Sequence, residues 1–357
     1  MRRVILISMP ESAEMTVFSD YRDHLSPDLA LEADANREVI EEILRLKAAG
    51  DVLILGHNYM SPLVFNLADE ECRGDSLALS IHAARTDKPV ILFNGVYFMA
   101  ETAKLLNPDK VVLIADKEAG CSLADGYRRE DVLELKRQYP GIPIVTYINS
   151  YAAIKAESDI CCTSANALDV IISRNSERVI FLPDSLMGRN LQEEIDRRGL
   201  GIDLIYPGKG NRLHQGTCEV HDKITVEEIR RIRIQHQLPK GHPRRVVLVH
   251  WECRPEVVEE ADFCGSTSQM SRYIRDHKPE RVFLGTECEM AANLEMEYPA
   301  TQFIRLCNVF CRHMARIRLD RIVDALKTRD HRYQVQVEEE ARLQALRPIQ
   351  RMLALSA

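Results

Sequence analysis

Val52-Leu-Ile-Leu-Gly-His57-Asn-Tyr59 is a short aliphatic run that ends in polar residues, and two later stretches repeat its plan. These are Pro143-Ile-Val-Thr-Tyr147-Ile-Asn149-Ser150 and Val246-Val-Leu-Val-His250-Trp-Glu252. Such a run is typical of a strand that is buried in a parallel sheet. Because ligands bind beyond the carboxyl ends of strands in open α/β units, we expect these polar ends to gather around one crevice.

The same further elements follow each of these stretches. We expect a helix that contains Leu67-Ala68-Asp69, Glu157-Ser158-Asp159 or Glu260-Ala261-Asp262. Next comes a turn suited to a helix N-cap, in Cys72-Arg-Gly-Asp75-Ser76, Cys162-Thr163-Ser164 and Cys264-Gly-Ser266-Thr267. Each unit then has a second strand, and the central residues of these strands are Val90-Ile-Leu-Phe93, Val179-Ile-Phe-Leu182 and Val282-Phe-Leu-Gly285. After another helix and a third strand, each unit closes on a cysteine at nearly equal spacing: Cys121, Cys218 and Cys311.

Buried strands that alternate with amphipathic helices predict an α/β fold of three αβα sandwich units, each with a parallel sheet. The predicted units are 37–130, 131–225 and 226–311, after an N-terminal extension over 1–36. The segment 312–357 should contain two helices, at 320–328 and 337–353, that pack against the body next to the first unit. If the units close around an axis, one cysteine from each can reach the centre.

Composition restricts the class of protein. A chain of 357 residues, 45% of them hydrophobic, can bury a large core over several domains. We expect no membrane span, because no aliphatic run has the required length, and the cytoplasm is then the default compartment. The formal charge of −7 argues against a nucleic-acid partner. An anionic substrate would therefore be held locally, at helix N-termini.

The ten cysteines are expected to be reduced and available for a metal. Two triples occupy equivalent positions in the repeat, and symmetry does not choose between them. The first, Cys72, Cys162 and Cys264, is also explained by the burial of small apolar side chains. The second lies in loops beyond strand ends, so its position favours it: Cys121, Cys218 and Cys311.

Three cysteines without a fourth leave one coordination site open for substrate, whether the metal is zinc or an iron–sulfur cluster. Cys307 forms a C-x3-C pair with Cys311. We interpret Cys307 as a neighbour that is not a ligand, or alternatively as a spare thiol for disulfide formation.

The sequence resembles the quinolinate synthase family from about residue 37 to residue 353, in five stretches that occur in the order and spacing of that family. The first three are Gly56-His-Asn-Tyr59 with Gly74-Asp-Ser76, Phe98-Met-Ala-Glu-Thr-Ala-Lys104 running to Ala119-Gly-Cys-Ser122, and Val145-Thr-Tyr-Ile-Asn149 with Cys162-Thr-Ser164. The last two are Gly216-x-Cys218-x-x-His221, and His250-x-Glu252-Cys253 with Gly265-Ser-Thr-Ser268. The chain departs from the usual pattern at Met60, at Trp251 and in the segment before Cys311.

The resemblance implies three Rossmann-like αβα domains, related by a pseudo-threefold axis, around a central 4Fe-4S cluster. Carried over by motif, the cluster ligands would be Cys121, Cys218 and Cys311. The implied activity is that of a transferase of NAD biosynthesis, which condenses iminoaspartate with dihydroxyacetone phosphate to quinolinate, with loss of phosphate and water. The open iron would act as a Lewis acid. An L-aspartate oxidase or aspartate dehydrogenase, as the source of iminoaspartate, is a candidate transient partner.

The predicted catalytic residues are Tyr59, Glu252 and His57. We expect burial to raise the pKa of Glu252 so that it serves as the general base, and the alternative is an ion pair with an arginine. Tyr59 with His57 resembles the family's proton donor, and the alternative is a hydrogen-bonded core pair. His221 is expected to orient the loop of Cys218.

The predicted substrate-binding groups lie at strand ends and helix starts: His57, Ser76, Tyr147, Asn149, Ser164, His250, Glu252, Ser266 and Thr267. The hydroxyl groups at helix starts are also explained by simple N-capping. Three rival functions remain: a zinc-dependent lyase or aldolase, a divergent paralogue that acts on another triose phosphate, and a non-catalytic cluster carrier.

Overall fold

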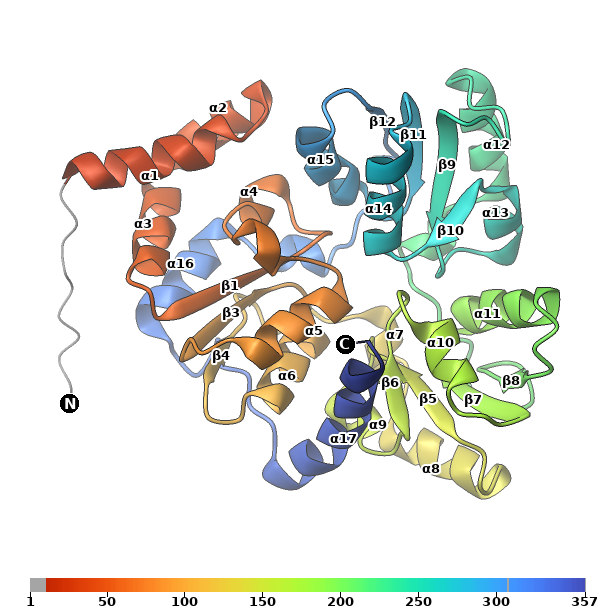
Figure 1. Ribbon diagram of the computed structural model, residues 1–357. Coiled ribbons are helices and arrows are strands. Elements are labelled where there is room, and N and C mark those ends of the chain that lie inside the picture. The colour runs from red at the N-terminus through yellow and green to blue at the C-terminus, as the bar shows by residue number, and fades with distance from the viewer. Residues whose placement is uncertain (1–10, 307, 357) are drawn as a thin grey trace.

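The aliphatic runs that open the three repeats form the first strands of three separate sheets in the computed structural model, which describes residues 11–306 and 308–356. Each sheet has four parallel strands in the same relative order: β2-β1-β3-β4, β6-β5-β7-β8 and β10-β9-β11-β12. The three sheets surround a common centre, as Figure 1 shows. The predicted α/β fold of three similar units is therefore confirmed.

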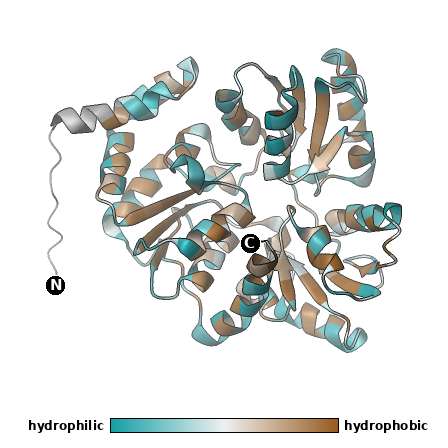
Figure 2. Ribbon diagram, viewed as in Figure 1, coloured by the Kyte–Doolittle hydropathy of each residue, from teal (hydrophilic) through white to brown (hydrophobic). Residues whose placement is uncertain are grey.

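Helices flank the three sheets, whose apolar strands lie innermost and appear brown in Figure 2. The first unit contains α3 (Arg37–Ala48), β1 (Val52–His57), α4 (Pro62–Phe65), β2 (Arg73–Gly74), α5 (Ser76–Arg85), β3 (Val90–Asn94), α6 (Tyr97–Leu106), β4 (Val111–Leu113) and α7 (Ser122–Asp125). The second contains α8 (Arg129–Gln138), β5 (Ile144–Tyr147), α9 (Ala152–Lys155), β6 (Ile160–Cys162), α10 (Ala167–Ile172), β7 (Arg178–Leu182), α11 (Ser185–Arg197) and β8 (Asp203–Ile205). The third contains α12 (Val226–Gln235), β9 (Arg245–His250), α13 (Pro255–Glu260), β10 (Phe263–Gly265), α14 (Thr267–His277), β11 (Arg281–Gly285), α15 (Cys288–Glu297) and β12 (Gln302–Ile304).

The segment after each first strand differs from the expected one. The helices α4, α9 and α13 end before the aspartate that was predicted to lie in them, and a short edge strand follows. The backbone N–H of Asp159 donates to the carbonyl of Ile144 in the neighbouring strand at 3.0 Å, and the Ile144 N–H donates to Oδ2 of Asp159 at 2.8 Å. Asp262 pairs with Val247 in the same way. Because these aspartates bond to the sheet, the helix stops, and the prediction of a continuous helix is wrong.

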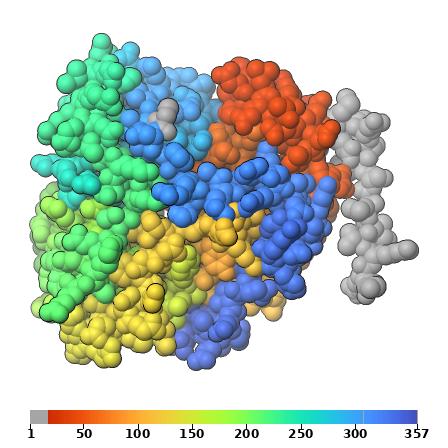
Figure 3. All heavy atoms as spheres, turned by 180° about the vertical axis from the view of Figure 1, so that it is seen from behind, coloured from red at the N-terminus to blue at the C-terminus, as the bar shows by residue number. Residues whose placement is uncertain are grey.

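Both helices of the C-terminal segment form, as α16 (Leu319–Thr328) and α17 (Glu339–Leu355). Between them, the backbone of Tyr333 and Val335 bonds to the edge of the first sheet, next to β4. The helix α16 packs on α3, and α17 packs on α6, α9 and β6, so it joins the first unit to the second. Seen from behind, this segment (blue) runs across the molecule (Figure 3). The residue boundaries of the three units stay predictions.

The N-terminal part of the described chain forms two further helices, α1 (Glu11–Asp23) and α2 (Pro27–Ala35). Across residues 11–306 and 308–356, the helices lack the combination of length and apolar character that crossing a membrane would require.

Candidate active site at the centre of the three units

The carboxyl ends of the strands meet in one cavity between the three units. Parallel strands that surround a centre turn the loops after them toward it, which is why residues distant in sequence meet there. The cavity is lined by nearly all the predicted site residues: His57, Tyr59, Ser76, Cys121, Tyr147, Asn149, Ser164, Cys218, His250, Glu252, Thr267 and Cys311. Ser266 is the predicted residue that does not line it.

Each of the three lining cysteines begins a turn of helix. The carbonyl groups of Cys121, Cys218 and Cys311 accept hydrogen bonds, at 2.9–3.0 Å, from the residues four positions later. Each sulfur also faces two backbone N–H groups, from the second and third residues after it: Leu123 and Ala124, Val220 and His221, and His313 and Met314. Backbone N–H groups at a helix start stabilise a negatively charged sulfur. The three turns are thus suited to hold thiolate ligands.

Burial raises the pKa of all three thiols, that of Cys311 to about 11, and the backbone N–H groups lower it in part. A cation in the cavity would favour the thiolates further, since metal binding removes the thiol proton. The chemistry of the donor set therefore fits an iron–sulfur cluster held by three cysteines with one iron open.

The rival triple has different surroundings. Cys162 is completely buried in β6, Cys72 is buried at the end of the short 3-10 helix Glu70–Cys72 that precedes β2, and Cys264 lies in β10. All three lie outside the lining of the cavity. Burial again raises their pKa, here without backbone N–H groups on the sulfur. Packing of small apolar side chains explains them. Cys307 lies outside the described residues.

Glu252 lies at the centre of the polar groups, with only 3% of its surface exposed. Its Oε2 is 2.8 Å from Nδ1 of His221, and Tyr147 donates a hydrogen bond of 2.5 Å to its Oε1. Burial raises its pKa, but the adjacent His221 and the hydrogen bonds from His221 and Tyr147 outweigh burial, so the pKa lies well below the usual value. The expectation of a raised pKa is wrong, and the side chain that faces the carboxylate is a histidine rather than an arginine.

A chain of hydrogen bonds continues from His221 to Tyr59. Nε2 of His221 lies 2.8 Å from Oγ1 of Thr286, which is 2.5 Å from the Tyr59 hydroxyl. Nδ1 of His221 is also 3.2 Å from the Cys218 sulfur. His221 therefore does more than orient a loop, because it contacts the carboxylate and a cysteine, and reaches Tyr59 through Thr286.

The two tyrosines of the cavity remain proton donors near neutral pH. Burial and the Glu252 charge raise the pKa of both Tyr59 and Tyr147 far above the usual value. The Tyr59 hydroxyl bonds to Thr286 rather than to His57, whose ring contacts the phenol ring edge-on at 4.9 Å between centroids. This geometry disagrees with the alternative of a hydrogen-bonded core pair.

His57 and His250 are uncharged at neutral pH, because burial lowers the pKa of both to about 3, although Glu252 opposes this effect. His250 stacks on His221 with 4.7 Å between the ring centroids, and its Nε2 lies 3.1 Å from Oγ of Ser164. Neutral imidazoles can donate one hydrogen bond and accept another, so both rings suit the recognition of a polar ligand.

The predicted hydroxyl groups differ in their use. Ser266 caps α14, since its Oγ accepts from the Gln269 N–H at 3.2 Å, and this capping explains it fully. Ser76 is the first residue of α5, and the cap there is Asp75. Thr267 accepts a hydrogen bond of 2.8 Å from the side chain of Asn58. Ser76, Ser164 and Thr267 thus keep their hydroxyl groups at the cavity wall.

Sequence reasoning missed Thr286 and Glu287. Both follow β11 directly, and Glu287 lines the cavity, where it accepts a hydrogen bond of 3.2 Å from the Cys311 N–H. Burial raises the Glu287 pKa to about 8, although two backbone N–H groups oppose this effect. A polar pair at the end of an aliphatic strand would have indicated these two residues. Such polar ends were considered for the first strand of each unit but not for the second.

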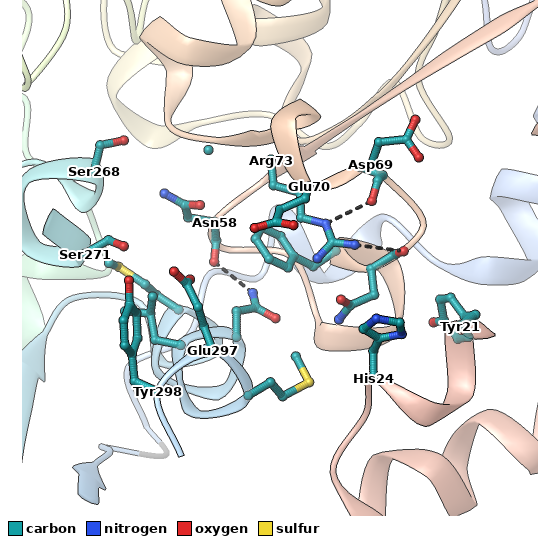
Figure 4. A pocket seen from close by; sticks show the side chains of 18 of the residues that line it. Tyr21, His24, Asn58, Asp69, Glu70, Arg73, Ser268, Ser271, Glu297 and Tyr298 are labelled. Carbon is teal, nitrogen blue, oxygen red and sulfur yellow. Dashed lines mark hydrogen bonds between the residues drawn. The ribbon is translucent and has the colours of Figure 1, made fainter. Parts of the chain in front are cut away.

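A second cavity, of about 780 Å³, lies between the first and third units (Figure 4). Its wall contains the oppositely charged residues Arg73 and Glu297. Asn293 also lies on this wall, and its side-chain amide donates a hydrogen bond of 3.1 Å to the carbonyl of Asn58. Asn58 also lies on this wall, and Thr267, which accepts its hydrogen bond, lines the central cavity. The Asn58–Thr267 pair therefore stands between the two cavities.

The ligand atoms of Cys218, His221 and Glu252 also lie within 4.8 Å of one another. A sulfur, a nitrogen and an oxygen at this separation are the donor types of a mononuclear zinc site. This set uses only one of the three cysteine turns, and its histidine and glutamate are already paired with each other.

Comparison with known proteins identifies the family. A family model described as quinolinate synthetase A protein matches residues 41–354. The chain is 45% identical to quinolinate synthase 1 of Mesorhizobium japonicum, over 88% of this chain and 91% of that protein. It is 45% identical to the quinolinate synthase of Agrobacterium fabrum, over 88% and 85% of the two chains. Identity to the quinolinate synthase of Caulobacter vibrioides is 41%, over 97% and 88%. This chain therefore belongs to the quinolinate synthetase A family of enzymes.

Proposed function

We propose that the chain catalyses quinolinate synthesis in the central cavity, by condensing iminoaspartate with dihydroxyacetone phosphate and releasing phosphate and water. The observation that carries the proposal is the meeting of three cysteine turns with Glu252, Tyr59 and Tyr147 around one cavity. The product is a precursor of NAD, which gives the reaction a role in pyridine nucleotide biosynthesis.

Cys121, Cys218 and Cys311 are the proposed ligands of a 4Fe-4S cluster. When bound, the cluster would supply a Lewis acid that polarises carbonyl and hydroxyl groups at its open iron. The support is the common geometry of the three turns, each with two N–H groups on the sulfur.

Glu252 is the proposed proton acceptor and Tyr59 the proposed proton donor. The reaction removes protons from carbon and nitrogen and protonates leaving oxygens, so it needs both kinds of group on one small intermediate. The low pKa of Glu252 keeps it ionised, and the high pKa of Tyr59 keeps it protonated. Tyr147 shares the carboxylate through its 2.5 Å hydrogen bond and fixes its orientation.

The remaining polar groups are proposed to bind the anionic substrates. Asn149, His57 and His250 offer neutral hydrogen-bond donors for carboxylates. Ser76 and Thr267 are the first residues of α5 and α14, where backbone N–H groups favour phosphate or carboxylate.

The compartment and the supply of substrate are proposals as well. The cytoplasm is the proposed location, because eight cysteines of the described residues are free thiols: Cys72, Cys121, Cys161, Cys162, Cys218, Cys253, Cys264 and Cys311. Iminoaspartate would come from an oxidase or dehydrogenase that acts on aspartate, and that enzyme is the proposed transient partner.

The test is anaerobic assay of the reconstituted protein with dihydroxyacetone phosphate and enzymatically generated iminoaspartate. We expect quinolinate from the parent chain, and a loss of roughly 10²–10⁴-fold in Glu252→Gln, the range typical of general acid–base catalysis. Glu157→Gln is the matched control, since Glu157 pairs with Arg129 and Lys136 and lies outside the cavity lining.

Different outcomes would identify the rival functions. A colourless preparation that contains zinc and is active would favour the lyase at Cys218, His221 and Glu252. Turnover of another triose phosphate in place of dihydroxyacetone phosphate would indicate a paralogue. A brown protein that forms no quinolinate, with iron content unchanged in Glu252→Gln, would indicate a carrier.

A further inference from the structure

The loops after the first strands of the three sheets carry a site residue at the same position. Tyr59, Asn149 and Glu252 lie two residues beyond the ends of β1, β5 and β9, and all three line the central cavity. A short helix begins five residues beyond each strand end, as α4, α9 and α13. The three loops are therefore equivalent in the repeat, and the contacts that fix them can be compared.

A buried asparagine of the second unit fixes the loop of Glu252. Asn190 lies in α11 with 2% of its surface exposed, and its Nδ2 donates to the carbonyls of Trp251 and Cys253, both at 2.8 Å. These two residues precede and follow Glu252 in the chain. Among the residues that the structure describes, Oδ1 of Asn190 is buried without a hydrogen-bond partner, so the amide holds the loop through its nitrogen.

Asn293 of the third unit holds the loop of Tyr59 in the same way. Its Nδ2 donates to the carbonyl of Asn58 at 3.1 Å and to that of Met60 at 2.9 Å, the residues on either side of Tyr59. Asn293 is the sixth residue of α15, and Asn190 is the sixth residue of α11. The contact therefore repeats with the fold, since a helix of one unit binds both carbonyls beside a site residue of another unit.

In the loop of Asn149, a lysine takes the place of the asparagine. The sixth residue of α6 is Thr102, in the first unit. Lys155, the last residue of α9, is completely buried, and its Nζ donates to Oγ1 of Thr102 at 3.1 Å. The same Nζ donates to the carbonyl of Ser150, the residue after Asn149, at 2.5 Å. The ammonium group thus joins α6 of the first unit to the site loop of the second.

The sequence around Lys155 differs from the other two loops in a way that fits this exchange. The residues equivalent to Lys155 are Phe65 and Val258, so packing at this position does not require a cation. The helices α4 and α13 begin with proline, which has no N–H, whereas α9 begins with Ala152. The Ala152 N–H donates to Oε2 of Glu101, in α6, at 2.7 Å. The first unit therefore also holds this loop at two points.

We infer that Asn190, Asn293 and Lys155 are positioning residues, each of which ties one site loop to a helix of the neighbouring unit. The inference rests on the proposed function, in which the three loops carry the proton acceptor, the proton donor and a substrate-binding group. A buried carbonyl that loses its donor is left unsatisfied, so its loop shifts toward another partner. Loss of each contact should therefore impair the step that its own loop serves, which general destabilisation would not do.

Asn190→Leu and Asn293→Leu test two of the contacts, because leucine keeps the branched shape of the side chain and removes the amide. We expect kcat for quinolinate formation to fall by about 10–100-fold in both, the scale of a misplaced catalytic group. Their dissociation constants for quinolinate should stay within about 2-fold of the parental value, since these loops serve the chemical step. Should a leucine variant fail to fold, the alanine variant at the same position carries the same prediction.

Lys155→Met should have the opposite pattern, because its loop carries the binding group Asn149. The variant should bind quinolinate, a dicarboxylate like iminoaspartate, about 10-fold more weakly, which is the contribution of about one hydrogen bond. Its kcat should stay within about 2-fold. Adding Thr102→Asn to Lys155→Met places an asparagine at the sixth position of α6, as in α11 and α15, and should restore binding. A folded double variant that still binds quinolinate weakly would contradict the equivalence of the three contacts.

Asn107→Leu is the matched control, because its amide also donates to two backbone carbonyls. Asn107 is 5% exposed, and its Nδ2 lies 2.8 Å from the carbonyl oxygen of Ala83 and 3.0 Å from that of Ala103. Both contacts lie within the first unit and outside the cavity lining. This variant should lose thermal stability and keep parental kcat and quinolinate binding. All variants should keep the parental iron content after reconstitution.

The pattern across the variants decides the inference. Parental kcat in Asn190→Leu and Asn293→Leu would overturn it, and so would equal losses of kcat and of quinolinate binding in all three single variants. Failure of the proposed function would appear separately, as absence of quinolinate from the parent chain or parental turnover in Glu252→Gln, and would overturn the inference with it.

Discussion

At the scale of single residues, the buried histidines of the cavity have the clearest consequence for stability. Burial lowers the pKa of His57 and His250 from 6.5 to about 3. Between these values the unfolded chain binds protons that the folded chain does not. The free energy of unfolding must therefore fall as the pH is lowered through this window.

His57→Gln tests this consequence. Between pH 6.5 and pH 5, the parent chain should lose stability more steeply than the variant, by up to about 1.4 kcal/mol per pH unit, the linkage of one proton. Urea unfolding at a series of pH values measures the slopes. His331→Gln, at an exposed position, should leave the parental slope unchanged. Equal slopes in the parent chain and His57→Gln would mean that His57 has the same pKa in the folded and the unfolded chain, which would contradict the effect of burial.

The identity of the catalytic candidates could be predicted from the sequence, but their charge could not. Glu252 was placed at a strand end, and burial was expected to raise its pKa. The opposite holds because His221 lies 2.8 Å away, on a segment that the chain brings back from the second unit. Thr286 follows a second strand, whose polar end was not considered, and its contacts with Tyr59 and His221, which are distant in sequence, required the structure.

At the scale of elements, the cysteine turns carry the argument for a cluster. A cysteine at the start of a helical turn has N–H groups within reach of its sulfur, and the three turns share this arrangement. The rival triple lies in or beside edge strands, where the sheet already uses the backbone groups.

Cys218→Ala should abolish stable binding of the cluster, because two sulfurs remain for it. Cys264→Ala is the control from the equivalent rival triple, and it should keep the parental content of iron and sulfide. Both contents are measured after anaerobic reconstitution and gel filtration. Full iron content in Cys218→Ala, or its loss in Cys264→Ala alone, would reverse the choice between the triples.

The pattern of apolar residues predicted the long helices and strands but not the short ones. The two inner strands of each sheet contain continuous aliphatic runs, which a buried parallel strand requires. The edge strands β2, β6 and β10 contain two or three residues, too few for a pattern. Before β6 and β10, Asp159 and Asp262 bond to the neighbouring strand. From the sequence alone, these aspartates were predicted to belong to the preceding helix.

At the scale of the whole molecule, the threefold repeat explains why one site contains residues from all three units. Because each sheet directs its strand ends inward, a residue's place in the repeat predicts that it faces the centre. It does not predict distances between units, which depend on how the units pack. The central pairing of His221 with Glu252 and Thr286 therefore required the structure.

The proposed function requires that the substrate and the three-cysteine cluster meet in one cavity. Mössbauer spectroscopy of the anaerobic protein, reconstituted with isotopically enriched iron, tests it most directly. On addition of quinolinate, we predict that the signal of a single iron of the cluster changes while the others stay as they were. A spectrum without a cluster, or a cluster whose signals do not respond to saturating quinolinate, would contradict the claim.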